Sequence, residues 1–336
     1  MNIAIITIYK AFNFGSFLQA YAMQEVLEKM GHKVTFLDCS MLSEYLKFRS
    51  LISIRTPLFS IRRLFKYRKD WKKLNCSRNI YQHFDLAIVG SDEVWNLNGG
   101  FEHWPQYLGE NINADRIIAY APSIGFMNPE ELISNICFRE ALRRFSAICP
   151  RDNITHDLCR QISNYVTECV VDPTLLMLGK WESIIPDSKK REDYLVYYSY
   201  LDDTPMKEYI LRFARKRNLK IIIVGFNYLW GDTVEICSPL EFISLLKNAK
   251  YVFTSTFHGS VFSTILKKKV IVRPSGQKVV DYLTFIDLKD HIFHDGITYD
   301  EFEYMTTKEI NYANIYKILN KGKKESITIL KNALET

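Results

Sequence analysis

Four short segments of this chain combine a backbone turn with side chains that bind anions or move protons. Residues 13–16 read Asn-Phe-Gly-Ser, where the glycine lets the backbone approach a ligand and the free N–H groups of a following helix attract anions. Residues 90–96 read Gly-Ser-Asp-Glu-Val-Trp-Asn. Two carboxylates beside a tryptophan suit a sugar, because the ring stacks on its apolar face and the carboxylates accept its hydroxyls. The alternative is a helix N-terminus with an acidic first turn.

The other two segments supply an arginine and a histidine. Arg151 follows the apolar run 145–149, where a guanidinium can clamp a carboxylate or phosphate, or simply pair with Asp152 at the surface. His258 lies in Thr-Ser-Thr-Phe-His-Gly-Ser, residues 254–260, at a predicted strand-to-helix turn. Hydroxyl groups and a helix N-terminus around a histidine are typical of an anion site. We therefore interpret His258 as functional rather than as a structural histidine.

The sequence lacks the patterns of several common active sites. There is no Gly-x-Gly-x-x-Gly fingerprint, P-loop, Gly-x-Ser-x-Gly nucleophile or Asp-x-Asp triplet. The seven cysteines include no Cys-x-x-Cys pair, and His291 and His294 have no other ligand types beside them. We predict no metal and no resident cofactor. Scattered cysteines and a start without a basic segment or cleavage site favour a reduced, cytoplasmic protein.

The elements that must position these segments alternate between apolar runs and helical periodicity. Residues 2–8 form a predicted strand, Ser16 is the predicted N-cap of a helix that ends at Gly31, and a second strand follows. Further strands are expected at 84–89, 116–120, 145–149 and 169–172, with helices near 130–142 and 157–164. After a polar stretch at 179–193, strands are expected at 194–198, 219–224, 251–255 and 270–272, with helices at 205–217, 240–248 and 260–266 and a final helix of about 25 residues.

Two consecutive blocks of this kind predict an α/β protein with two Rossmann-like domains facing a cleft. The first domain is expected over residues 1–180, with a basic helical insertion near 40–80, and the second over residues 190–336, ending in helix. Ligands of such folds bind at the carboxyl ends of the strands, which is where all four segments fall.

The net charge of +6 is too small to indicate nucleic-acid binding. Residues 47–78, however, hold eleven Lys or Arg against one acid, Asp70, with Leu58, Ile61, Leu64 and Phe65 at helical spacing. This pattern favours a helix that contacts an anionic membrane surface, so that the protein is cytoplasmic and peripheral at the inner membrane. The alternatives are contact with an acidic or phosphorylated acceptor, and a solvated helix whose apolar stripe packs on the first domain.

Taken in order along the chain, these segments resemble the polysaccharide pyruvyl transferase family. The matching stretches span about residues 1–275 and are Asn13-Phe14-Gly15, Leu18-Gln19-Ala20-Tyr21-Ala22, Gly31-His32-Lys33-Val34, Gly90-Ser91-Asp92-Glu93-Val94-Trp95-Asn96, Tyr120-Ala121-Pro122-Ser123-Ile124-Gly125, Asp172-Pro173-Thr174-Leu175-Leu176 and Phe257-His258-Gly259. The resemblance implies a glycosyltransferase-B-like fold. It also implies transfer of pyruvate from phosphoenolpyruvate to sugar hydroxyls as a ketal, in the biosynthesis of bacterial surface polysaccharide, or exopolysaccharide.

The resemblance carries the family's functional histidine over to His258 and its strand-end arginine to Arg151. With the chemistry of the four segments, it predicts His258, Arg151 and Asp92 as catalytic residues, Asn13, Gly15, Ser16, Ser255, Gly259 and Ser260 as donor-binding residues, and Glu93, Trp95 and Asn96 as acceptor-binding residues. His258 is the expected acid, whether toward the methylene carbon or the leaving phosphate, and Asp92 or Glu93 is expected to orient or deprotonate the acceptor hydroxyl.

Three positions depart from the family pattern. Glu93 stands where the family often has Gln, Thr256 where some members have Arg, and Asp152 where many have Glu after the arginine. The donor site is therefore less positively charged than the family pattern implies. Two alternative functions remain open on the sequence: a metal-independent glycosyltransferase that uses a nucleotide sugar, and a non-catalytic sugar-binding relic of the fold.

Overall fold

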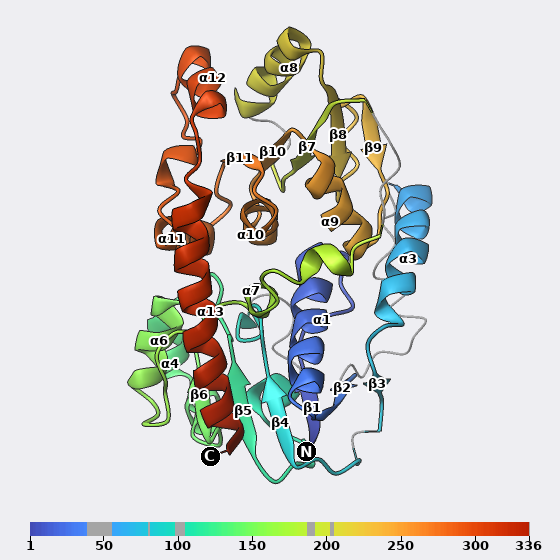
Figure 1. Cartoon of the computed structure of the whole chain (residues 1–336). Helices are drawn as coiled ribbons and strands as arrows, with labels where there is room; N and C mark the ends of the chain where they lie inside the picture. Colours follow the sequence, from blue (N-terminus) through green and yellow to red (C-terminus); the bar gives the residue numbers. More distant parts are fainter. Residues whose placement is uncertain (39–55, 80, 98–104, 187–191, 202–204, 336) are drawn as a thin grey trace.

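Two parallel sheets, each flanked by helices, lie one beyond the other along the long axis of the molecule (Figure 1). The computed structural model describes residues 1–38, 56–79, 81–97, 105–186, 192–201 and 205–335. The arrangement confirms the predicted α/β fold class.

The first sheet has six strands in the order β3-β2-β1-β4-β5-β6, all parallel. Ile3 of the central strand β1 lies opposite Val34 on one side and Leu86 on the other. Both faces of β4 are buried, which explains its unbroken apolar run. The strands are β1 Asn2–Ile6, β2 Lys33–Leu37, β3 Cys76–Ser77, β4 Leu86–Val89, β5 Ile117–Tyr120 and β6 Ala147–Cys149. The helices are α1 Phe14–Lys29, α3 Pro57–Trp71, η2 Pro105–Leu108, α4 Pro129–Ser134, α5 Ile136–Leu142, α6 Asn153–Arg160, α7 Pro173–Leu176 and η3 Trp181–Ser183.

The second sheet has five parallel strands in the order β11-β10-β7-β8-β9. They are β7 Tyr194–Tyr198, β8 Lys220–Val224, β9 Thr233–Glu235, β10 Tyr251–Thr254 and β11 Lys269–Val272. The helices that follow or connect them are α8 Pro205–Arg217, α9 Pro239–Asn248, α10 Phe257–Ile265, α11 Gln277–Phe285, η4 Lys289–His291 and α12 Tyr299–Thr307.

The last helix, α13 Tyr312–Glu335, runs alongside both sheets (Figure 1). Near its start, the Tyr316 hydroxyl donates to the carbonyl of Ile265 in α10. Toward its end, Ser326 Oγ accepts the Val171 N–H at 2.9 Å, and the Leu334 carbonyl accepts Arg116 Nη2 at 2.8 Å. The segment expected as the end of the second domain therefore packs on the first sheet as well.

Three local expectations are wrong. Asn13, not Ser16, caps α1, because its side chain accepts the Gly15 N–H at 2.9 Å. The predicted strand at 169–172 is extended backbone outside either sheet and leads into the short helix α7. The helix expected near 130–142 is two helices, since Asn135 ends α4 and its side chain caps α5 through the Phe138 N–H.

The polar stretch at 179–193 contains one deeply buried anchor. The indole of Trp181 is 1% exposed, donates from Nε1 to the Thr174 carbonyl at 2.8 Å and packs edge-on against Phe262 of α10. This side chain links the end of the first unit to the second.

Among the described residues, none of the helices combines the length and hydropathy that a membrane-spanning segment needs.

Candidate active site

His258 lies at the junction of the two sheets, in the first turn of α10. Thr256 caps this helix by accepting the Gly259 N–H at 3.0 Å. The imidazole is 5% exposed and lies directly on Gly15 of α1, where a Cβ atom would stand 1.9 Å from His258 Nδ1. Only glycine fits at this position. The first and fourth predicted segments, 243 residues apart along the chain, are therefore in contact.

A buried set of charged residues surrounds the imidazole; we call Asp92, Arg151, Asp172 and His258 the charged cluster. His258 Nε2 lies 3.6 Å from Asp172 Oδ2, and Arg151 Nη1 lies 3.1 Å from the same oxygen. Arg151 Nη2 reaches Asp92 Oδ1 at 3.5 Å. Asp172 also accepts hydrogen bonds from the backbone N–H and hydroxyl of Thr174 at 3.0 and 2.6 Å. Loops after β4 and β6, the N-terminus of α7 and the first turn of α10 thus meet at one point.

The electrostatics of the charged cluster favour the ionised forms. Burial alone raises the pKa of Asp172, but His258 and Arg151 outweigh it and hold that pKa well below the ordinary value. Burial likewise opposes ionisation of Asp92, and Lys278, Arg151 and His258 lower its pKa. Burial lowers the pKa of Arg151, and Asp92 and Asp172 more than restore it. His258 Nε2 is buried and has no hydrogen bond to any described residue, and Asp172 is its ion-pair partner.

Lys278 brings a second cation to the junction. Its Nζ lies 2.5 Å from Glu93 Oε1, so this ion pair joins α11 to the turn after β4. Asn96 holds the other carboxylate oxygen of Glu93 through Nδ2 at 3.1 Å, and both side chains pack over Gly125. Sequence reasoning missed Lys278, because a lysine in an amphipathic helix carries no signal of its partner. It also missed Asp172 as a site residue, although a polar Asp-Pro-Thr turn after an apolar run was a usable signal.

The sequence matches the family described as polysaccharide pyruvyl transferase over residues 13–275. The chain belongs to this family. It is therefore a transferase, and the match covers every residue of the charged cluster. No curated protein matches the sequence.

Solved structures show the fold of this transferase. UDP-GlcNAc 2-epimerase from Methanocaldococcus jannaschii is similar at 14% identity and a TM-score of 0.51, covering 99% of this chain and 100% of the epimerase. UDP-GlcNAc 2-epimerase from Neisseria meningitidis is similar at 10% identity and a TM-score of 0.52, covering 98% and 100%. An uncharacterised Klebsiella pneumoniae protein is similar at 15% identity and a TM-score of 0.50, covering 87% and 93%. These likenesses show a two-domain glycosyltransferase-B fold.

Trp95, predicted to stack on the acceptor, is not available in this transferase. Its side chain is 0% exposed, its Nε1 donates to the Tyr107 carbonyl at 2.9 Å, and Phe138 and Phe145 meet it edge-on. The turn after Asp92 folds back into the core of the first sheet, and the Trp95 indole lies in that core. Asn96 and Glu93, from the same segment, remain beside Lys278.

Several predicted donor-binding groups are already occupied. Ser260 Oγ donates to the Thr256 carbonyl at 3.0 Å, and Ser255 Oγ accepts the Tyr200 N–H at 2.9 Å. The N–H of Gly259 is held by its N-cap, and Ser16 is buried in α1. These groups are buried and hold the turns through hydrogen bonds within the protein. Of the predicted donor set, Asn13 and Gly15 remain at the junction with the charged cluster.

The fold assembles one group with metal-ligand chemistry that the sequence did not predict. Among the described residues, His83, Asp85 and Asp115 place one ligand atom each within 4.8 Å of one another. Asp85 and Asp115 precede β4 and β5, whereas Asp92 follows β4, so this group lies at the opposite edge of the first sheet. It is therefore separate from the charged cluster.

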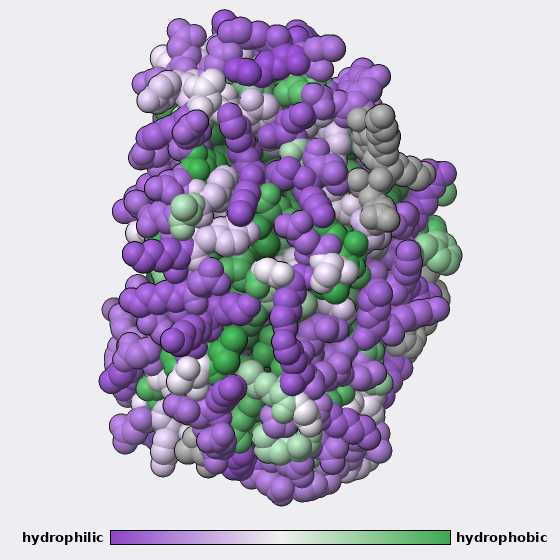
Figure 2. Space-filling model, in the orientation of Figure 1, coloured by the Kyte–Doolittle hydropathy of each residue, from purple (hydrophilic) through white to green (hydrophobic). Residues whose placement is uncertain are grey.

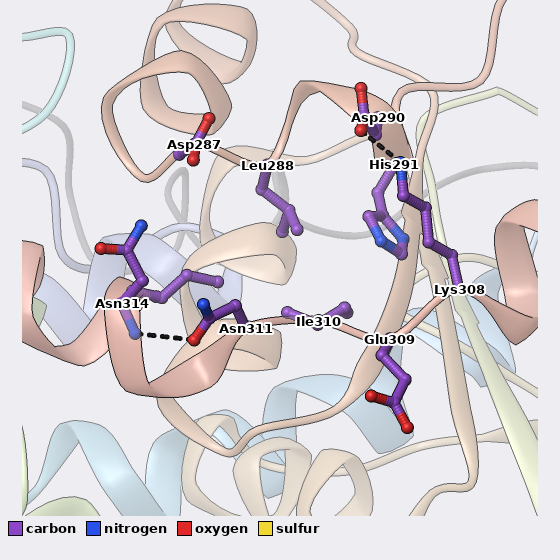
Figure 3. Close-up of a pocket in the computed structure, with 10 residues that line it drawn as sticks. Asp287, Leu288, Asp290, His291, Lys308, Glu309, Ile310, Asn311 and Asn314 are labelled. Atoms are coloured by element: carbon purple, nitrogen blue, oxygen red, sulfur yellow. Dashed lines mark hydrogen bonds and ion pairs between the residues drawn. The ribbon is translucent and has the colours of Figure 1, made fainter.

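A cavity of about 140 Å³ lies outside the charged cluster, between η4 and the start of α13 (Figure 3). Carboxylates, amides and one buried imidazole line it, including Asp287, Asp290, His291, Asn311 and Asn314. Lys308 forms an ion pair with Asp290 at its wall. His291 bonds the Val270 carbonyl at 3.0 Å, which gives it a structural role.

Proposed function

We propose that this protein transfers pyruvate from phosphoenolpyruvate to two hydroxyls of a saccharide, forming a ketal in bacterial surface polysaccharide biosynthesis. The observation that carries the proposal is the charged cluster: a buried imidazole that faces Asp172, lies against Gly15 and stands beside an ionised arginine. The family membership supports the same chemistry.

Phosphoenolpyruvate carries a carboxylate and a phosphate, so its site needs two cations. Arg151 is one, but Asp92 and Asp172 already neutralise it. Lys278 is the other; its side chain is 26% exposed and forms an ion pair with Glu93. We assign the phosphate to Lys278, which leaves Glu93 when the donor binds. Glu93 then points its released carboxylate at the acceptor.

In the proposed reaction, the methylene carbon of phosphoenolpyruvate gains a proton and becomes a methyl group. The central carbon, now electrophilic, forms a bond to each of two sugar oxygens, and its bond to the phosphate oxygen breaks. The two hydroxyl protons account for the new methyl C–H and for the protonated phosphate. We assign the transfer of this proton to His258, since histidine is the side chain that most often acts as a general acid or base.

Asp92 does not suit the role of general base. A carboxylate whose pKa is held down by neighbouring cations is a weak proton acceptor. We assign Asp92 instead to the orientation of Arg151. Its backbone supports this, because Asp92 adopts a left-handed φ of 69°, rare for a residue other than glycine.

Binding of the donor can be measured without an acceptor. At about 100 times its Kd, phosphoenolpyruvate should raise the melting temperature of the wild type by a few degrees. Glu93→Gln should bind it several-fold more tightly, because an ion pair of this exposure contributes up to about 1 kcal/mol. Lys278→Ala should bind it more weakly. Lys216→Ala, which removes a surface ion pair with Glu303, is the matched control.

The same measurement separates the alternative functions. Stabilisation by UDP-GlcNAc in place of phosphoenolpyruvate would favour a nucleotide-sugar glycosyltransferase. An epimerase of similar fold, solved with bound UDP-GlcNAc, supports testing this nucleotide sugar. If neither ligand shifts the melting temperature, the proposed donor and the nucleotide-sugar alternative both fail.

We further propose a membrane location for the acceptor, based on α3. Residues 47–55 of the basic stretch lie outside the described residues. Within α3, Leu64, Tyr67 and Trp71 pack into the core beside α9, and buried Asp70 accepts the Leu240 N–H at 2.9 Å. The opposite face presents Leu58 and Phe65, 72% and 69% exposed, in line with Arg62, Lys69 and Lys72. Figure 2 shows apolar surface at the edge of the molecule over α3.

Two exposed apolar side chains framed by cations suit an anionic lipid surface that carries a lipid-linked acceptor. We expect the protein to sediment with vesicles containing phosphatidylglycerol at low salt and to be released at high salt. Phe65→Ser should weaken binding, and Tyr165→Ser, which alters another exposed aromatic residue, should not. Equal binding to neutral and anionic vesicles, or to neither, would show that α3 only joins the two domains.

A further inference from the structure

Three aromatic side chains gather where β7 and β8 end; we call Tyr200, Phe226 and Tyr228 the aromatic platform. Phe226 stacks on Tyr228 with ring centroids 5.5 Å apart and planes 9° from parallel. Tyr200 meets Phe226 edge-on at 5.4 Å. Beneath them, Tyr198 of β7 stacks on Phe226 at 6.1 Å. The platform therefore rests on a packed base and presents rings that hold their orientation.

Tyr200 places the platform beside the charged cluster. Its ring is 49% exposed, and its hydroxyl accepts a hydrogen bond from Asn13 Nδ2 at 3.3 Å. Asn13 caps α1 and lies two residues before Gly15, the residue that contacts the His258 imidazole. Burial first, and then the charges of Asp92 and Glu93, raise the pKa of Tyr200 to about 12. The platform thus borders the carboxylates at the junction.

We propose that the aromatic platform is the acceptor subsite and that it binds the apolar face of a pyranose ring. This deepens the proposed function, because a sugar stacked on Tyr200 directs its hydroxyls toward Glu93 and toward a donor held at His258. Aromatic rings with fixed orientation bind C–H faces well, and nearby carboxylates accept sugar hydroxyl protons. The sequence assigned this stacking role to Trp95, which is buried elsewhere.

The charges nearby favour a neutral sugar over a nucleotide. A nucleobase also stacks on aromatic rings, but the proposed donor phosphate already takes Lys278, so the diphosphate of a nucleotide would lie close to Asp92, Glu93 and Asp172. Arg151, His258 and Lys278 are the side chains that face these three carboxylates in the ion pairs of the described residues, and each is already paired with at least one of them. Sugar hydroxyls donate to carboxylates instead of being repelled by them.

The subsite can be tested with methyl β-D-galactopyranoside, in which H3, H4 and H5 form one apolar face. In saturation-transfer difference NMR, these protons should receive the strongest saturation from the wild type. Tyr200→Ala should lower the affinity about tenfold, since it removes a stacking ring. Tyr200→Phe keeps the ring and should stay close to the wild type. Tyr304→Ala, at an exposed tyrosine of α12, is the matched control.

The results separate this inference from the function on which it rests. No saturation of the galactoside by the wild type, or equal saturation by Tyr200→Ala, would overturn the acceptor subsite. Saturation of the uracil protons of UDP that is lost in Tyr200→Ala would also overturn it, because the platform would then bind a nucleobase. A failure of phosphoenolpyruvate to raise the melting temperature would remove the proposed donor, whereas the galactoside spectra report the subsite independently.

Discussion

His258→Ala should lower turnover by about 10²–10⁴-fold and leave the fold intact. The imidazole lies within the charged cluster and faces Asp172, and histidine is the side chain that most often transfers protons in catalysis. The truncation opens space against Gly15 and removes one ion-pair partner of Asp172, while Arg151 stays paired with that carboxylate. Steady-state turnover with phosphoenolpyruvate and a saccharide acceptor measures the loss of activity. Circular dichroism measures whether the fold is intact.

His83→Ala is the control for this substitution. His83 is exposed and pairs with Asp115 at 2.9 Å, at the other edge of the first sheet. The loss of the His83 imidazole should leave turnover unchanged. That result would show that the group of His83, Asp85 and Asp115 is not needed for catalysis. A well-folded His258→Ala protein with wild-type turnover would remove the histidine from the mechanism.

Asp172→Asn should cost about 3–5 kcal/mol of stability, because it leaves Arg151 buried with one remaining carboxylate. The hydrogen bonds from Thr174 can persist, since the amide oxygen replaces Oδ1. Turnover should fall as well, by about 10²–10⁴-fold, because the carboxylate that faces His258 Nε2 is gone. Thermal unfolding and turnover at one temperature measure the two effects separately.

The pH dependence of that stability loss follows from the sign of the pKa shift. Folding lowers the pKa of Asp172, so its charge stabilises the protein above the ordinary aspartate value of about 4 and ceases to do so as the pH falls below it. The difference in melting temperature between wild type and Asp172→Asn should therefore narrow as the buffer is made more acidic than about pH 4. A difference that widens in acid would show that Asp172 is not held as the anion.

The sequence was sufficient where a residue's neighbours along the chain determine its setting. Apolar runs predicted most of the central strands, and the strand-to-helix turn at His258 predicted its place at a helix N-terminus. Arg151 and Asp92, each just past a strand, were predicted for the same reason. Their convergence follows from parallel strands, whose carboxyl ends share one edge.

The remainder depends on contacts between distant segments. Trp95 and Tyr200 are both aromatic residues after a strand, and only the packing around each decides that one is buried and the other half exposed. Lys278 finds Glu93 across 185 residues. The hydroxyls near His258 form hydrogen bonds with backbone groups of their own turn, because those groups lie close by along the chain.

The long helix α13 contacts both sheets, so we expect the two sheets to unfold together. A single continuous core contains Ile5 of the first sheet, Val252 of the second and Leu334 of this helix. Separation of the two sheets would expose part of this shared core. Each sheet would then lose apolar contacts that help it to remain folded. We therefore expect the contact between Gly15 and His258 to be lost when either sheet unfolds.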